Sequence, residues 1–360
     1  NFIRKDSGFD NFLITTNTYY ARDMLRKKFN NRISIYSLPF DLTYSLNHFI
    51  DSSTFIALVI VETELWPNLI WQAGRRNIPV FIVNGRISDK TCRTYRLFSF
   101  FLKHVFSDIE LVLAQSGEHA SRFISSGIES SKVNTTGNIK YYRDIETYND
   151  NIHKENIITF GSIKEKELDD VLNVVYSLKR RFPLLKYFIA PRELNLADTI
   201  ENKLSGHLAS IRYSVLRGSS GESLLPNAEV VIVDTVGDLL DIYRSSMIAF
   251  VGGSLAPYGG QNILEPIFYS TPVLFGPYIE NFKDISDTIL KNGAGIMVNN
   301  RDELIEKISL LIEDDELRDK MGKKGTKIID AQREVMEKTV DFIMKTVTVR
   351  RRSDVRIYST

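Results

Sequence analysis

The sequence predicts an α/β protein built from two Rossmann-like domains in tandem, and three observations support this fold class. Short apolar runs rich in β-branched residues alternate with longer helical patterns along the chain, as is typical of parallel sheets covered by helices on both faces. A chain of 360 residues exceeds what one hydrophobic core usually serves. A polar stretch at 141–156 (YYRDIETYNDNIHKEN) divides it. We therefore expect one domain over 1–145, a second over 146–346 and a basic tail over 347–360.

The apolar runs and the helical patterns give the expected elements in chain order. In the first half, strands are expected over 12–16, 33–37, 55–61, 80–83, 111–114 and 133–136, and helices over 19–29, 65–76 and 117–126. In the second half, strands are expected over 157–160, 187–190, 211–216, 230–233, 247–251, 273–275 and 295–298. Helices there are expected over 165–181, 194–205, 236–245, 282–291 and 302–322.

Composition excludes several classes of protein. The net charge of +1 gives no overall field that would attract nucleic acid. The single cysteine, Cys92, excludes a disulfide framework and fits a reducing cytoplasm. No apolar run approaches the 18 or so residues that a membrane-spanning helix needs. The five histidines show no pair at metal-ligand spacing, which gives little support to a metal site; no cofactor is expected.

A glycine-rich loop at 252–266 (GGSLAPYGGQNILEP) carries the strongest functional signal. It follows the apolar run at 247–251 and contains four glycines and two prolines. Glycines let backbone N–H groups approach a ligand closely, and a helix N-terminus favours an anion such as phosphate. Glu265, one turn later, is placed to accept from vicinal hydroxyls such as those of a ribose. The alternative is a tight strand-to-helix turn that binds no ligand.

Polar residues also follow other expected strands directly. They lie at 62–67, 137–140, 191–192 and 234–238. Ligands of open α/β sheets bind at the carboxyl ends of the strands, so we expect these segments to form a site. Two Rossmann-like domains with such a site are the architecture of many nucleotide-sugar glycosyltransferases.

Seven motifs together give the chain a family resemblance. These are VETELWPNL (61–69), VNGRISDKTCRTY (83–95), GNIK (137–140), APR (190–192), DTVGDL (234–239), VGGSLAPYGGQNILEP (251–266) and FGPYIENF (275–282). In this order and spacing the chain resembles the 3-deoxy-D-manno-octulosonic acid (Kdo) transferases of lipopolysaccharide biosynthesis, over about three quarters of its length.

The resemblance implies a two-domain GT-B fold whose domains face a cleft, with CMP-Kdo as donor and a lipid A precursor, lipid IVA, as acceptor. It also implies that the enzyme needs no metal and works at the cytoplasmic face of the bacterial inner membrane. Two alternatives stay open. The chain could be a GT-B transferase for another nucleotide sugar, or a protein that binds a nucleotide sugar or lipid without catalysis.

The resemblance assigns roles to individual residues. Glu62 and Lys140 would support the transition state, with Glu64 as a nearby alternative carboxylate. The expected CMP-binding residues are Pro191, Arg192, Val236, Gly237, Asp238, Asn262, Ile263, Leu264 and Glu265. Structural roles compete with these assignments for two residues, because Glu62 could cap the helix expected at 65–76 and Arg192 could form a surface salt bridge. Trp66 is expected to be a packed core aromatic.

The chain departs from the family pattern at several points. A Ser-x-Gly-Glu segment, whose Glu is the family's proposed general base, is absent from these residues, and Glu193, Gln261 and Tyr278 stand where histidines are expected. We therefore expect this form to bind CMP without transferring Kdo. We also expect its first sheet to lack an opening strand and helix, which leaves an uncovered edge that favours aggregation.

The segment 75–106 is basic and aromatic. It carries seven Lys or Arg residues against one Asp, with Leu and Phe interleaved. Such a segment could dock on anionic lipid, or it could be a core helix with a solvated face.

Overall fold

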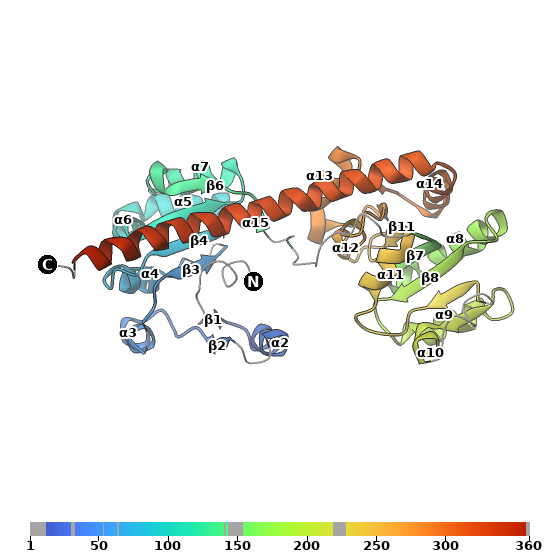
Figure 1. The fold of residues 1–360 in the computed structure, drawn as a ribbon, viewed down its shortest axis with the longest axis horizontal. Helices are drawn as coiled ribbons and strands as arrows, with labels where there is room; N and C mark the ends of the chain where they lie inside the picture. The colour runs from blue at the N-terminus through green and yellow to red at the C-terminus, as the bar shows by residue number, and fades with distance from the viewer. Residues whose placement is uncertain are drawn as a thin grey trace. The chain divides into compact units, whose positions relative to one another are not determined.

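The protein is described by a computed structural model that covers residues 12–29, 33–52, 54–62, 65–139, 142, 154–218 and 228–357. The chain divides into two compact units (Figure 1). The first unit comprises 1–142 together with 332–360, and the second comprises 143–331. The expected α/β class with parallel sheets is confirmed in both units, because every strand pair found is parallel.

The first unit contains two separate parallel sheets. Four strands run in the order β3 (Leu58–Val61), β4 (Val80–Gly85), β5 (Ile109–Ala114) and β6 (Val133–Thr135). The other two, β1 (Leu13–Thr16) and β2 (Ser34–Ser37), pair only with each other. The helices are α2 (Tyr19–Phe29), α3 (Thr43–Asp51), α4 (Pro67–Gly74), α5 (Asp89–Leu97), α6 (Ser99–Ser107) and α7 (Gly117–Ser125).

The four-stranded sheet is covered on both faces. One face packs on α4, α5, α6 and α7 through a core that includes Ile70, Cys92, Phe106 and Phe123. The other face is covered by the end of the last helix, α15 (Asp315–Ile357). Successive residues of β4 serve the two cores in turn, since side chains alternate across a strand.

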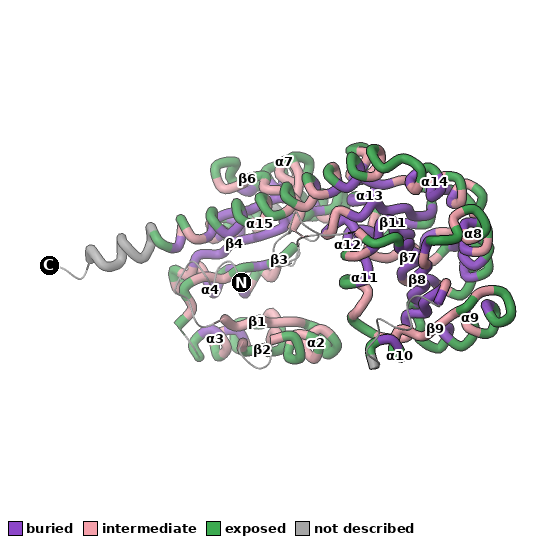
Figure 2. Tube along the Cα trace, turned by 45° about the vertical axis from the view of Figure 1, so that its right-hand side comes forward, coloured by how far each residue is buried: buried purple, intermediate pink, exposed green. Residues whose placement is uncertain are grey.

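The second unit holds one continuous sheet of seven parallel strands. Their order is β13 (Gly295–Met297), β12 (Val273–Phe275), β11 (Ser246–Val251), β7 (Glu155–Ile163), β8 (Lys186–Pro191), β10 (Val230–Ile232) and β9 (Ser210–Arg212). Figure 2 shows β7, β8 and β11 buried for most of their length, whereas β1 and β2 are mainly half-buried or exposed.

Helices cover both faces of the seven-stranded sheet. The larger core lies under α8 (Leu168–Arg181), α9 (Leu196–Leu204) and α14 (Arg301–Glu313), and the smaller one under α10 (Tyr213–Gly218) and α11 (Leu239–Ser245). The short α12 (Leu264–Ile267) and α13 (Lys283–Asn292) complete the unit.

The structure divides the chain differently from the expected domains at the C-terminal end. Residues 332–346 were assigned to the second domain and 347–360 to a basic tail, but α15 runs to Ile357 and its residues from 332 group with the first unit. The physical reason is burial. Ile343 and Val347 pack against Phe81, Val83 and Leu113 of the first sheet and are only 5% and 4% exposed.

Two expected elements also differ, and one helix was not expected. The strand expected at 211–216 ends at Arg212, because the chain turns there into α10 and Leu216 joins the smaller core. The helix expected at 302–322 is two helices, α14 and α15, separated at Asp314. The helix α3 was not expected; Leu46 and Ile50, one turn apart, bury its inner face.

Candidate functional site

Glu62 directly follows strand β3 and has a backbone conformation that few glutamates adopt. Its φ is 66°, in the left-handed region that costs energy for a residue with a Cβ. Its N–H donates to the carbonyl of Val83 at 2.9 Å, and its side chain is exposed. The neighbouring Glu64 lies outside the described residues. The fold therefore holds Glu62 at the carboxyl edge of the first sheet, beside the end of β4.

Another carboxylate caps the helix that follows Glu62. The N–H groups of Asn68 and Leu69, in the first turn of α4, donate to the two carboxylate oxygens of Asp41 at 3.1 and 2.9 Å. These are the N–H groups that a capping side chain normally satisfies. Asp41 therefore fills the helix-capping role that was the structural alternative for Glu62. Trp66 packs partly buried on the core of α3 and α4, in agreement with its expected role.

A buried asparagine, Asn84, connects the end of β4 to the loop that carries the GNIK motif. Asn84 is 3% exposed and has a φ of 54°. Its side-chain oxygen accepts the N–H of Ile139 at 3.0 Å, and its carbonyl accepts from the side chain of Gln115 at 3.1 Å. Ile139 directly precedes Lys140, which lies outside the described residues. Asn84 thus links the Glu62 and Lys140 segments.

Sequence reasoning did not single out Asn84 as a site residue. The available signal was an Asn-Gly pair directly after a buried strand, where Asn tolerates a left-handed conformation. Its side-chain partner, the N–H of Ile139, lies 55 residues away in the chain.

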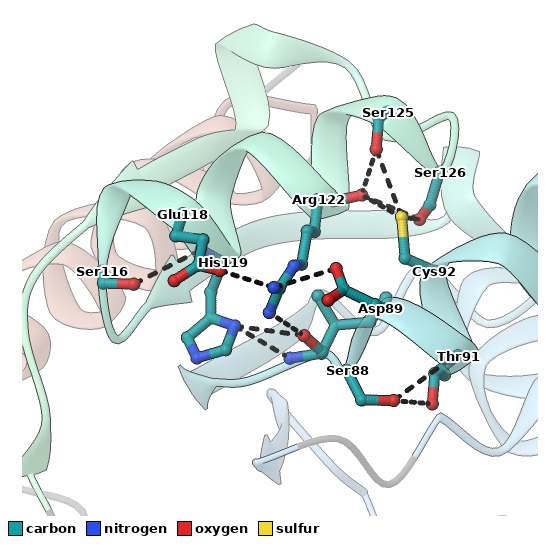
Figure 3. A network of polar contacts seen from close by, with 11 residues as sticks. Ser88, Asp89, Thr91, Cys92, Ser116, Glu118, His119, Arg122, Ser125 and Ser126 are labelled. Atoms are coloured by element: carbon teal, nitrogen blue, oxygen red, sulfur yellow. Dashed lines mark hydrogen bonds and ion pairs between the residues drawn. The ribbon is translucent and has the colours of Figure 1, made fainter. Parts of the chain in front are cut away.

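A polar network holds the start of α5 against α7 (Figure 3). Arg122 donates to the carbonyl of Ile87 at 3.0 Å and forms ion pairs with Asp89 and Glu118. His119 also contacts the carbonyl of Ile87, at 3.1 Å. Much of the VNGRISDKTCRTY motif is therefore engaged in fixing the loop after β4.

In the second unit, the N–H groups at the start of the glycine loop bind a carboxylate of the protein itself. Glu167 is fully buried and accepts from Gly253, from Ser254 at 3.2 Å, from Leu255 at 3.1 Å and from Lys164 at 3.0 Å. Burial raises the pKa of Glu167, and these four hydrogen bonds oppose the shift. An anion does sit at this loop, but it is a side chain, so the backbone N–H groups of 253–255 are already engaged.

The signal for Glu167 in the sequence was weak. It lies three residues after Lys164 and its carboxylate returns to the Lys164 N–H, in the manner of a capping box. Gly253 in the glycine loop lies 86 residues from Glu167. No local sequence pattern therefore indicates the other three hydrogen bonds.

Asn262 and Glu265 lie together at the start of α12. The Asn262 side chain donates to Glu265 at 3.2 Å and accepts the N–H of Leu264 at 3.3 Å. Ile263 and Leu264 are buried, so their side chains support the turn from inside. Asn262 and Glu265 are half-buried, and they are the members of this expected CMP segment whose polar groups reach the surface.

The DTVGD turn after β10 contains buried polar atoms without partners. In the part of the chain that the structure describes, the Thr235 hydroxyl and one carboxylate oxygen of Asp238 are buried and form no hydrogen bond. The other Asp238 oxygen pairs with Arg217 at 2.8 Å. Val236 is 85% exposed, and Gly237 has a φ of 99°. Buried polar groups are nearly always satisfied, so these two atoms are exceptions, as are six other buried side-chain atoms among the described residues.

Two cations lie at the carboxyl ends of β7 and β8. Arg192 is exposed, its N–H donates to the carbonyl of Ile163 at 2.8 Å, and it forms no ion pair within the described ranges. Among the described residues, then, no surface salt bridge accounts for Arg192. Lys164 pairs with Glu193 at 2.9 Å and lies 4.9 Å from the ring centre of Tyr258. Pro191, the last residue of β8, is buried. Sequence reasoning missed Lys164.

The expected donor residues come together along one edge of the second sheet. Strands β11, β7, β8 and β10 are consecutive neighbours and parallel, so the loops after them line the same carboxyl edge. That edge presents the cations after β7 and β8, the unsatisfied turn after β10, and the Asn262–Glu265 pair.

The described residues provide neither a metal-binding cluster nor a membrane-spanning helix. No cluster of three or more His, Cys, Asp or Glu side chains there could hold a metal ion. Among the same residues, no helix combines the length and the apolar composition needed to cross a bilayer.

Comparison with known proteins identifies relatives. The family described as 3-deoxy-D-manno-octulosonic-acid transferase (kdotransferase) matches residues 3–143. A bifunctional glycosyltransferase/methyltransferase of Fusobacterium nucleatum is 33% identical over 84% of this chain, which spans about half, 48%, of that protein. A 3-deoxy-D-manno-octulosonic acid transferase of Haemophilus influenzae is 29% identical over 95% of this chain and 81% of its own length.

A solved structure supports the fold over the whole chain. The UDP-GlcNAc 2-epimerase of Neisseria meningitidis, bound to UDP-GlcNAc, superposes with a TM-score of 0.57 over 93% of both chains at 15% identity. At that identity the likeness concerns the fold alone, which is the two-domain GT-B type. The sequence comparisons support the expectation from the seven motifs: residues 3–143 match the Kdo transferase family, and the chain is similar to 3-deoxy-D-manno-octulosonic acid transferases over most of its length.

Proposed function

We propose that this chain carries the donor-binding and transition-state-stabilising residues for the transfer of Kdo from CMP-Kdo to a lipid A precursor, lipid IVA, at the cytoplasmic face of the bacterial inner membrane. The observation that carries the donor half of the proposal is the DTVGD turn, whose Thr235 hydroxyl and Asp238 carboxylate oxygen are buried without partners. Both atoms are buried in this conformation, so a nucleotide would reach them only if the exposed turn at Val236 and Gly237 moved as it bound; a ribose or a base would then offer both donors and acceptors.

The proposed donor site extends along the carboxyl edge of the second sheet. Arg192, with Lys164 beside it, supplies positive charge for the CMP phosphate. Because the N–H groups of 253–255 are engaged by Glu167, the phosphate relies on these side chains more than on the glycine loop. Asn262 and Glu265 remain to bind the ribose, with Pro191, Val236, Gly237, Ile263 and Leu264 shaping the walls.

The proposed chemistry belongs to the edge of the first sheet. Glu62, held in a strained conformation and free of a capping role, and Lys140, whose loop Asn84 anchors, would stabilise the charges that develop as CMP departs. Groups preorganised in this way act mainly on the transition state and little on the ground state.

The test separates donor binding from transfer. By calorimetry we expect CMP to bind, and UDP and GDP to bind at least about tenfold more weakly. Thr235→Val, which keeps the shape and removes the hydroxyl, should weaken CMP binding by about tenfold, the scale of one lost hydrogen bond. Thr288→Val, whose hydroxyl bonds only within α13, is the matched control and should bind CMP normally.

Transfer is measured with any residues that the gene encodes before Asn1 present. Glu62→Gln and Lys140→Ala should each lower turnover by roughly 10²- to 10³-fold while CMP affinity stays the same. UDP binding as tight as CMP binding would point to a transferase for another nucleotide sugar. Normal CMP binding with no transfer by the wild type would favour a binding protein without catalysis.

A further inference from the structure

Helix α6 carries apolar side chains on the side that faces the core and also on the side that faces away from it. Leu102, Val105 and Phe106 pack into the core of the first unit. Phe100 and Phe101 point outward and are 83% and 73% exposed. The exposed side of α6 also carries Lys103 and His104, so the two phenylalanines form an apolar patch beside charged side chains, and exposed apolar patches of this kind mark contact surfaces.

The exposed apolar surface continues around the corner between α5 and α6. Leu97 ends α5 with 80% of its surface exposed, and Phe98, at the junction, is 51% exposed. The rings of Phe100 and Phe101 contact each other edge to face with their centres 5.6 Å apart. We call Leu97, Phe98, Phe100 and Phe101 the aromatic corner. Soluble proteins rarely expose such a contiguous patch unless something binds it.

The side chains around the aromatic corner are positively charged. Lys90, Arg93 and Arg96 on α5 and Lys103 on α6 are exposed, and within the described ranges none of the four forms an ion pair. The acid of these two helices, Asp89, is paired with Arg122. The corner thus carries a basic rim whose charges are not balanced locally.

We propose that the aromatic corner and its basic rim dock this protein on a bilayer that contains anionic lipid. Apolar side chains inserted at the boundary between headgroups and acyl chains, surrounded by cations, are what such a surface binds. A second copy of this chain fits less well, because a symmetric contact would bring the same four cations together. The proposal rests on the proposed function in one respect, namely that the acceptor is a membrane lipid.

The experiment is vesicle flotation with the whole 360-residue chain and no nucleotide. Vesicles of phosphatidylcholine with phosphatidylglycerol should carry the protein upward, and vesicles of phosphatidylcholine alone should carry much less. Phe100→Ser with Phe101→Ser should lower the partition coefficient by about a hundredfold. Arg93→Gln with Arg96→Gln should lower it by roughly 25-fold, at about fivefold for each charge.

Matched controls test whether vesicle binding depends on where in the fold the exposed residue lies. Phe40 is as exposed as Phe100, at 83%, and Phe40→Ser should leave flotation unchanged, as should Lys320→Gln on the second unit. Because all these residues are exposed, the variants should keep their circular dichroism melts. Equal flotation of the wild type and the Phe100, Phe101 variant would overturn the proposal, and so would an equal loss in Phe40→Ser.

Two further readouts separate this proposal from its alternatives. If the wild type ignores vesicles but self-associates, and the Phe100, Phe101 variant is monomeric, the corner is a contact between copies and the proposal is wrong. Vesicle binding needs no donor or acceptor, so a failure of Kdo transfer leaves this result intact. Conversely, Phe100→Ser with Phe101→Ser should retain CMP affinity.

Discussion

The two units use the same parallel strands but complete their sheets in different ways. The second unit joins seven strands into one sheet and covers both faces with helices from its own segment. The first unit leaves its strands in two pieces, of four and of two. It also takes the cover of one face from residues at the far end of the chain.

Burial follows the same division. Every residue of β11 is buried, whereas on β3, at the edge of the four-stranded sheet, Val59 and Val61 are 40% and 55% exposed. Parallel strands are normally buried on both faces. The second unit, which carries the proposed donor site, forms its core from its own segment of the chain. The first unit, which carries Glu62, depends on residues of α15 from the other end of the chain.

The largest effect is expected at the internal anion of the second unit. Glu167→Ala leaves the N–H groups of Lys164, Gly253, Ser254 and Leu255 buried without an acceptor. This should lower the free energy of unfolding of that unit by about 3–5 kcal/mol. Hydrogen exchange of the β11 amides measures it.

The chain's two tryptophans, Trp66 and Trp71, both lie in the first unit, so their fluorescence reports that unit alone. In Glu167→Ala the fluorescence midpoint in urea should stay unchanged, and Glu165→Ala, an exposed neighbour, should change neither signal. An equal shift of the tryptophan transition would show that the two units do not unfold separately.

A smaller effect is expected where α15 covers the first sheet. Ile343→Ala removes a side chain that is 5% exposed and packs on Phe81 and Leu113. It should cost about 2–4 kcal/mol, and it should shift the tryptophan transition. The exposed Lys345→Ala on the same helix is the control. If the β11 amides lose protection and exchange faster instead, the assignment of this segment to the first unit is contradicted.

The smallest effect is expected in how the stability of the second unit depends on pH. Burial lowers the pKa of Lys154 from 10.5 to about 7, although its ammonium group bonds to the carbonyl of Arg244 and the hydroxyl of Thr271 at 2.8 and 2.6 Å. Between pH 7 and 10 the folded state therefore binds fewer protons than the unfolded state, so this group makes stability rise with pH.

Lys154→Met should remove that rise. The unfolding free energy of the second unit, measured by urea titration at pH 7 and pH 9, should increase more in the wild type than in the variant. Equal increments in both proteins would show that Lys154 keeps its ordinary pKa in the folded chain.

The strands and the motif positions could be predicted from the sequence because they depend on local patterns. Runs such as 247–251 are β-branched or aromatic and continuous, and the structure has β11 there. The polar segments that follow these strands lie at the carboxyl edge of the second sheet, as the general rule for parallel sheets requires. The family resemblance added the prediction of which of these residues bind CMP.

Contacts between distant segments could not be predicted in this way. Asp41 caps a helix 27 residues away, and Glu167 reaches a loop 86 residues away. The C-terminal residues looked like a basic tail by composition, yet Val347 is buried against strands near the start of the chain. Local patterns show that a helix has an apolar face; they do not show which sheet that face covers.

The return of α15 to the first sheet has a consequence for protein synthesis. Ribosomes deliver the first unit early, and domains generally fold in the order in which they emerge. Here Phe81, Val83, Leu111 and Leu113 must wait, uncovered, until Ile343 and Val347 leave the exit tunnel. The unit made first is therefore finished last. During translation its apolar strands are the natural target of chaperones that hold nascent chains.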